Sequence, residues 1–190
     1  MKFINLNTEK KLPVFDKQGE TYVVFFHNYS GKLNFEIRGS DIKLYIYGLY
    51  IGKKGDEFHI ETIQNHVAPG SLSDLFIKGV FEDKSKFIYQ GLIRLEKTAQ
   101  KSHAYQKNQN LILSDGVFVD SRPFLEILAN DVFCTHGSTT GKLDRDQLLY
   151  ARTRGLSENV AEKMLVNGFV EELIDKVKTF KNDFVFSVKV

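Results

Sequence analysis

The sequence has one cysteine, three prolines and almost no excess of charge of either sign. The lone Cys134 excludes a disulfide within the chain and fits a reducing compartment such as the cytoplasm. The 26 lysines and arginines against 24 aspartates and glutamates leave a net charge of +2, whereas nucleic-acid-binding proteins usually have a larger or more clustered positive excess. No run of 18 apolar residues occurs, and the first residues lack an apolar stretch, so neither a membrane span nor a signal peptide is predicted.

Hydrophobic residues make up 42% and charged residues 26% of the 190-residue chain, which is typical of a folded domain with one core. Up to about residue 130 the pattern is that of successive β-strands. Residues 32–38 alternate strictly, for example, with Leu33, Phe35 and Ile37 on one face. The predicted strands are 21–26, 32–38, 42–51, 57–63, 75–81, 87–95, 110–113, 116–119 and 124–128.

Two architectures fit this succession of strands, an antiparallel sandwich and a parallel β-helix. No helical pattern of 10 to 15 residues separates the strands, which argues against a doubly wound α/β fold. The strand pattern is the same in a sandwich and in a β-helix. Because no strict hexapeptide or nonapeptide repeat marks a β-helix, the pattern alone slightly favours the sandwich.

From about residue 144 the apolar period becomes helical. Asp144 and Gln147 resemble a capping box that begins a first helix, and Gly155 is suited to end it. Ser157 is the predicted N-cap of a second helix that ends near Gly168. A third helix is expected over 169–177 and a short strand over 183–189. The expected organisation is a β body over 1–140, a helical domain over 141–180 and a terminal strand over 181–190.

The segment 134–142 is the main candidate for chemistry. Its part from Gly137 to Lys142 resembles a phosphate-binding loop, but three residues separate the glycines where a P-loop has four. Leu143 also stands where a P-loop has the serine or threonine that binds magnesium. This spacing argues against nucleotide binding.

Cys134 and His136 lie two residues apart, so on an extended strand their side chains project to the same side. They could form a nucleophile–base pair, although no cysteine-hydrolase signature surrounds them. They could bind a metal, and because two ligands are too few for a closed site, a second chain would have to complete it. Cys134 could instead be a buried small hydrophobic residue and His136 a hydrogen-bonded loop residue, which the pair alone favours. Ordinary turn or surface roles are expected for His27, His59, His66 and His103.

An ordered series of motifs changes this balance. The motifs occupy residues 65–71, 114–116, 121–127, 131–144, 147–157 and 167–169. Together they resemble the SufB/SufD family, also called stabiliser of iron transporter, whose members assemble iron–sulfur clusters, and the Cys-x-His-Gly form at Cys134 is similar to the SufD branch. The resemblance implies a mainly β fold, a right-handed parallel β-helix followed by a small helical domain. Family members are commonly much longer, so the chain resembles a short form lacking the N-terminal half, either natural, as Met1 favours, or part of a longer chain.

The resemblance also implies a non-enzymatic, cytoplasmic scaffold of a SUF-type assembly complex. Cys134 and His136 are then expected at a subunit interface, where they bind iron or a transient iron–sulfur cluster. The expected partners are a SufC-like ATPase, because the chain has no Walker motif, and a SufB-like chain or a second copy; neither nucleic acid nor membrane is expected. The residues expected to dock the ATPase are Gln147, Arg152, Arg154, Leu156 and Leu173.

Alternative interpretations remain for each of these expectations. The helices could merely cap the open end of the β-helix, whose exposed edge would otherwise favour aggregation. Instead of an assembly subunit, the chain could be a small β-rich enzyme that uses Cys134 and His136. It could also be a β-helix interaction module that has no cluster chemistry.

Overall fold

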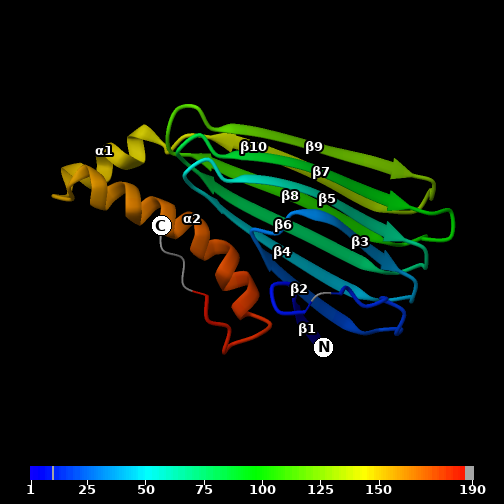
Figure 1. Ribbon diagram of the computed structural model, residues 1–190. Coiled ribbons are helices and arrows are strands. Elements are labelled where there is room, and N and C mark those ends of the chain that lie inside the picture. Colours follow the sequence, from blue (N-terminus) through cyan, green and yellow to red (C-terminus); the bar gives the residue numbers. More distant parts are fainter. Residues whose placement is uncertain (10, 187–190) are drawn as a thin grey trace.

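The computed structural model describes residues 1–9 and 11–186, which form a parallel β-solenoid of about four turns followed by two helices (Figure 1). The strands are β1 (Lys2–Asn5), β2 (Thr21–His27), β3 (Gly31–Ile37), β4 (Lys43–Gly52), β5 (Glu57–His66), β6 (Leu72–Phe81), β7 (Lys86–Leu95), β8 (His103–Ile112), β9 (Phe118–Ile127) and β10 (Phe133–Gly141). The helices are α1 (Arg145–Thr153) and α2 (Glu158–Lys178). The parallel β-helix expected from the family resemblance is therefore confirmed, and the sandwich that the pattern alone favoured is wrong.

The strands form two parallel sheets. Sheet A has the order β1-β2-β4-β6-β8-β10, and sheet B has the order β3-β5-β7-β9. The register partners Lys43, Leu72, His103 and Phe133 lie 29 to 31 residues apart, so one turn of the solenoid takes about 30 residues. Because this repeat is long and its length varies, it leaves no short sequence period of the kind by which hexapeptide β-helices are identified.

The inward-facing side chains of both sheets meet in one apolar core. The strict alternation in β3 leaves Leu33, Phe35 and Ile37 at most 4% exposed, and they pack against inward residues of sheet A such as Leu44 and Ile46. Full burial of a side chain of this kind is worth roughly 1.5–3 kcal/mol. The interior therefore supplies the main driving force that stacks successive turns.

Polar side chains replace apolar ones in the interior of the later turns. Gln64 Nε2 donates to Ser73 Oγ at 2.7 Å, and Nε2 of His66 lies 2.7 Å from the same hydroxyl. Asn110 Nδ2 donates to Asn108 Oδ1 at 2.7 Å. All five side chains are at most 3% exposed. The turn or surface role expected for His66 is thus wrong: it ends strand β5 inside the solenoid, where a hydrogen bond satisfies one ring nitrogen.

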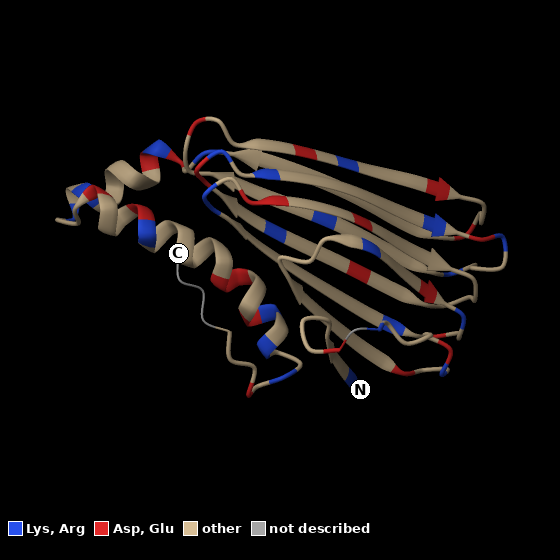
Figure 2. Cartoon of the chain, viewed as in Figure 1, with Lys and Arg blue, Asp and Glu red and all other residues tan. Residues whose placement is uncertain are grey.

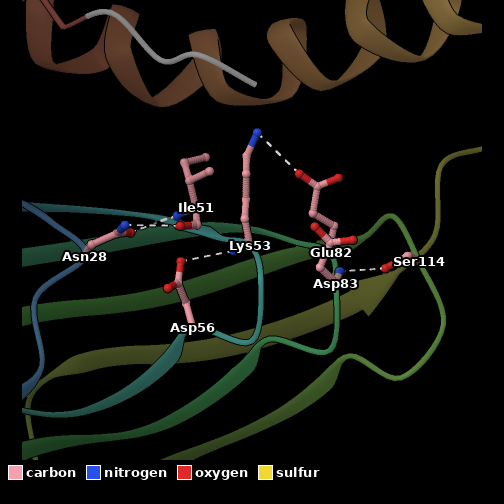
Figure 3. A network of polar contacts seen from close by, with 7 residues as sticks. All are labelled: Asn28, Ile51, Lys53, Asp56, Glu82, Asp83 and Ser114. Atoms are coloured by element: carbon pink, nitrogen blue, oxygen red, sulfur yellow. Dashed lines mark hydrogen bonds and ion pairs between the residues drawn. The ribbon is translucent and has the colours of Figure 1, made fainter.

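Polar contacts between turns fix the corners of the solenoid (Figure 3). The Asn28 side chain donates to the Ile51 carbonyl at 3.1 Å and accepts from the Ile51 amide at 2.8 Å. Its backbone has φ 48°, a left-handed conformation that asparagine tolerates better than most residues. One turn later, Lys53 Nζ lies 3.3 Å from Glu82 Oε1. These contacts hold neighbouring corners in register.

Helix α2 lies across the outer face of sheet A (Figure 1). It runs without interruption through Gly168, so the two separate helices predicted there are wrong. Its buried side chains Val166, Val170, Leu173 and Val177 pack against sheet A. Burial of this row outweighs the roughly 1 kcal/mol that a glycine costs inside a helix.

Further strand boundaries differ from the prediction. The segments predicted as separate strands over 116–119 and 124–128 form the single strand β9, and 110–113 is the end of β8 rather than a short strand. His103, expected in a loop, is the first residue of β8. Residues 181–186 contain no assigned strand, and the rest of the strand predicted over 183–189 lies outside the described residues.

Candidate functional site

Strand β10, the last of sheet A, carries Cys134 and His136 in its inward row. They are in register with Ala104 and Gln106 of β8, which are both buried. Within the described part of the chain, β10 pairs only with β8, and its other edge is free. The inward row of β10 therefore forms the open end of the solenoid, where Cys134 is half-buried and His136 is exposed.

Cys134 sits in an apolar environment. It packs against a small cluster of Ile93, Leu95, Ala104 and Val132. Burial raises the pKa of its thiol to about 11. A nucleophilic cysteine needs the opposite shift, produced by a neighbouring cation or a helix N-terminus. The environment thus argues against a nucleophilic role for Cys134.

The donor set fits a shared site better than a site within one chain. No group of three or more His, Cys, Asp and Glu side chains that could hold a metal ion occurs in residues 1–9 and 11–186. Cys134 and His136 supply one thiolate and one imidazole, which suit iron, zinc or an iron–sulfur cluster. Two donors leave coordination positions that further ligands must fill.

Apolar side chains surround the open end of the solenoid. Phe124, Leu125 and Ile127 of β9 are 39–50% exposed, and Phe133 of β10 is 54% exposed. Strand β9 contains Pro123, which lacks an amide hydrogen and is best tolerated in an edge strand such as this one. Exposed apolar residues beside unpaired strand edges are typical of an interaction surface.

The two helices form a second candidate surface beyond the strand ends. Asp144 Oδ1 accepts from the amides of Asp146 at 2.8 Å and Gln147 at 3.1 Å, so the predicted N-cap of the first helix is confirmed. Gly155 follows that helix with φ 93°, the left-handed conformation expected of a glycine stop. Ser157 is the N-cap residue of α2, but its side chain makes no capping hydrogen bond.

A groove of about 600 Å³ lies between α1 and α2. Of the residues predicted to dock a partner, Gln147, Arg154 and Leu156 line it. Arg152 lies outside the lining and pairs with Glu158 at 3.4 Å. Leu173 is fully buried against sheet A, so a docking role for it is not supported.

Sequence reasoning missed the exposed apolar residues of this helical end. Leu149, Tyr150, Val160 and Met164 are 48–63% exposed. The sequence signal is the helical period of apolar residues from about residue 144, which does not show which of them stay exposed. Their exposure marks the helical end as a surface that a partner could cover.

No helix in the described part of the chain is both long and apolar enough to cross a bilayer. Figure 2 shows both signs of charge interspersed along the helices, strands and turns, in line with the small net charge.

Comparison with known proteins identifies the family. The family model of the SUF system FeS cluster assembly SufBD core domain matches residues 27–169. The iron–sulfur cluster assembly protein SufD of Escherichia coli K12 is 32% identical over 155 residues, which are 82% of this chain and 36% of that protein. An iron–sulfur cluster assembly SufBD family protein of Mycobacterium leprae is 31% identical over 156 residues, 78% of this chain and 39% of the relative. One of Synechocystis is 29% identical over 126 residues, 66% of this chain and 27% of the relative.

The chain spans less than two-fifths of the length of these relatives. The family model nevertheless matches most of the chain, from the end of the second strand into helix α2. The sequence-based resemblance is confirmed: the chain belongs to the SufBD family of iron–sulfur cluster assembly proteins.

Proposed function

We propose that this chain is a non-enzymatic scaffold subunit of a cytoplasmic SUF-type complex that assembles iron–sulfur clusters. In this proposal the open end of the solenoid pairs with a SufB-like chain or a second copy, and the helical end binds a SufC-like ATPase. The observation that carries the proposal is the position of Cys134 and His136 in the inward row of a strand whose outer edge is free. Iron or the nascent cluster is the cargo of this site.

A twofold pairing would complete the ligand set. Two copies of β10 related by a twofold axis run antiparallel, and an axis through Thr135 sets Cys134 of one chain opposite His136 of its partner. Directly opposed residues of such a pair lie about 4.5–5.5 Å apart between Cα atoms. Two thiolates and two imidazoles then converge, a set that suits iron or a small cluster.

The pairing can be tested by crosslinking. With Cys134 replaced by serine, we expect Thr135→Cys to form a disulfide-linked dimer on mild oxidation, because the two sulfurs would face each other across the axis. Thr139→Cys in the same background is the matched control, since its partner position lies eight residues away along the opposed strand. Equal crosslinking of the two variants, or a strict monomer at high micromolar concentration with no complex with a SufB-like chain, would contradict the pairing.

Ligand binding can be tested by anaerobic reconstitution with iron(II) and sulfide, followed by desalting. We expect Cys134→Ser and His136→Ala each to lower the retained iron without changing the far-ultraviolet circular dichroism. His103→Ala is the matched control, because His103 is an exposed histidine on the neighbouring strand. Equal iron in wild type and the Cys134/His136 double variant would remove the ligand role and favour an interaction module.

Docking of the ATPase is proposed at the groove between α1 and α2. Met164 lines this groove and is 48% exposed, so Met164→Asp should abolish binding to a SufC-like ATPase without unfolding the chain. Lys163→Asp, on the neighbouring exposed position outside the groove, should leave binding unchanged. If Met164→Asp binds the ATPase as well as wild type does, the docking proposal is contradicted, and only the role of capping the β-helix remains for the helices.

A further inference from the structure

A second groove, of about 580 Å³, lies between helix α2 and the outer face of sheet A. The strands contribute Asp74, Phe76, Tyr105 and Lys107, and the helix contributes Glu172 and Lys176. The groove also borders β10 at His136, but its wall is formed by the outward rows of the strands. The pairing of the open end proposed above makes no use of this outer face.

Lysines from two different elements converge on the floor of this groove. The floor is Phe76, whose side chain is 3% exposed. Lys107 Nζ from β8 lies 5.1 Å and Lys176 Nζ from α2 lies 5.9 Å from the centroid of its ring. Both lysines are exposed, and with the described residues neither forms an ion pair within 4 Å. Both ammonium groups therefore lie within 6 Å of the centroid of one aromatic ring.

The groove carries a positive excess. A third ammonium, that of Lys78, lies 5.3 Å from the same ring, but it is bound by the Glu172 carboxylate and by the Phe169 carbonyl. Asp74 is the remaining carboxylate of the lining; burial raises its pKa, and the charges of Lys176 and Lys107 oppose that rise. The buried Lys78, which does not line the groove, thus neutralises Glu172, and the two lysines of the lining face one remaining carboxylate, that of Asp74.

We propose that this groove binds a small organic anion. The flat apolar body of the ligand lies against the partly exposed Tyr105, beside the nearly buried Phe76, and its single negative group lies between Lys107 and Lys176. The volume is within the range of small-molecule sites, and an apolar floor with a few convergent polar groups is their usual composition. The ligand would contact the outward side of Thr135 in β10 and would therefore lie against the strand that carries His136.

The probe for this site is naphthalene-2-sulfonate, which has a flat apolar body and one negative charge. Binding is measured by titration with nuclear magnetic resonance detection. The uncharged 2-naphthalenemethanol tests the charge requirement, and inorganic sulfate tests the need for the ring. We expect saturable binding of the sulfonate that weakens with added salt, and clearly weaker binding of the other two.

Variants assign the binding to the groove. Lys107→Gln and Lys176→Gln should each weaken binding of the sulfonate by about 1.5- to 5-fold, the usual range for loss of one exposed ionic contact. Asp74→Asn should tighten binding, because it removes the carboxylate that competes for the two lysines. Lys163→Gln changes the net charge equally on the same helix but outside the groove, and it should have no effect.

The proposal is overturned by any of three results: no saturable binding at ten-millimolar sulfonate, equal binding of the alcohol, or equal weakening by Lys163→Gln and Lys107→Gln. Unfolding midpoints in urea check that each variant keeps the wild-type stability. Lysines 107, 163 and 176 are all exposed, so their replacement leaves the core intact. Because the test involves neither iron nor a second chain, its failure would not affect the role proposed for Cys134 and His136.

Discussion

The ion pair between Lys78 and Glu172 joins strand β6 to helix α2, and its two members differ sharply in exposure. Lys78 is 1% exposed and Glu172 is 49% exposed. Lys78 Nζ also donates to the Phe169 carbonyl at 2.6 Å and lies 4.0 Å from the centroid of the Phe169 ring. The pKa of Glu172 is lowered, mainly by the hydrogen bond from Lys78, whereas the pKa of Lys78 is also lowered because burial outweighs the favourable effect of Glu172. The pair therefore offsets only part of the cost of burying the ammonium group.

This asymmetry predicts unequal effects of removing either partner. Glu172→Gln leaves a buried ammonium group without its counter-charge and should lower the free energy of unfolding by about 1–3 kcal/mol, less than for a fully buried pair because water reaches Glu172. Lys78→Met removes the buried charge and leaves a carboxylate that water can solvate. We expect it to cost about 1 kcal/mol or less, mainly for the lost hydrogen bond to the Phe169 carbonyl.

The assay is urea unfolding followed by far-ultraviolet circular dichroism, since the chain has no tryptophan. In the Lys78→Met background, Glu172→Gln should lower the free energy of unfolding much less than it does in the wild-type chain. Glu171→Gln is the matched control, because Glu171 pairs with Lys178 at 2.6 Å on the exposed side of the same helix. A cost of Glu172→Gln no greater than that of Glu171→Gln, or a cost of Lys78→Met that exceeds that of Glu172→Gln, would refute the reasoning.

The same pair predicts a dependence on pH. The folded-state pKa of Glu172 is lowered from its ordinary value of 4.5, so its stabilising contribution is present above that value and is lost as the pH falls through the folded-state pKa. The difference in stability between wild type and Glu172→Gln should therefore shrink at acidic pH. A difference that stays constant from pH 7 to pH 3 would assign the effect to packing rather than to charge.

Three further predictions concern buried groups. Burial lowers the pKa of His66 from 6.5 to about 4, so the unfolded chain takes up a proton on this side chain at a higher pH than the folded chain does. Between pH 7 and pH 4.5, wild type should therefore lose about 2–3 kcal/mol more stability than His66→Gln, and equal losses would contradict this. In urea unfolding, Leu173→Asp should lower the free energy of unfolding by about 4 kcal/mol or more, and the exposed control Met164→Asp by less than about 1 kcal/mol. A stable Leu173→Asp variant would show that α2 does not need its contact with sheet A. Alkylation of Cys134 by iodoacetamide should rise with pH toward a midpoint near its pKa of about 11, and a midpoint at or below the ordinary value of 9.0 would show a thiol that is not buried.

The first turns of the solenoid could be predicted from the sequence because their interior is apolar. In β3 the alternation of Leu33, Phe35 and Ile37 identified both the strand and the buried face. The pattern could not reveal how the strands pair, because alternation is the same whether the neighbouring strand is antiparallel or lies one turn away in a solenoid. Parallel pairing became the expectation only through the motifs shared with a family.

Strand β8 could not be predicted in full because its inward row is polar. Gln106, Asn108 and Asn110 face the interior, where Asn108 and Asn110 hydrogen-bond each other and Gln106 Nε2 donates to the Gly91 carbonyl. A run of this composition resembles a loop when hydrogen-bond partners are unknown. A helix end was wrongly predicted at Gly168. Helix α2 continues through this glycine because its apolar row packs on sheet A.

The placement of Cys134 and His136 was predictable only in part. Their spacing put both side chains on one side of a strand, but nothing local showed that this strand is the last of its sheet. That position decides their availability: one turn earlier, the same row is buried at Ala104 and Gln106. The role of the pair therefore depends on the point in the chain at which the solenoid stops.

The change of the interior from apolar to polar along the solenoid bears on the interface proposed at its open end. One inward row runs through Val24, Ile46, Leu75, Gln106 and His136 in successive strands of sheet A. Had the apolar part of this row continued to the last turn, the open end would expose a core-like surface beside free strand edges, the arrangement most prone to aggregation. A polar last row can be hydrated while the chain is alone and can exchange that water for a partner or a metal at little cost. The proposed scaffold, which would take up a cluster and release it, needs an end of this kind.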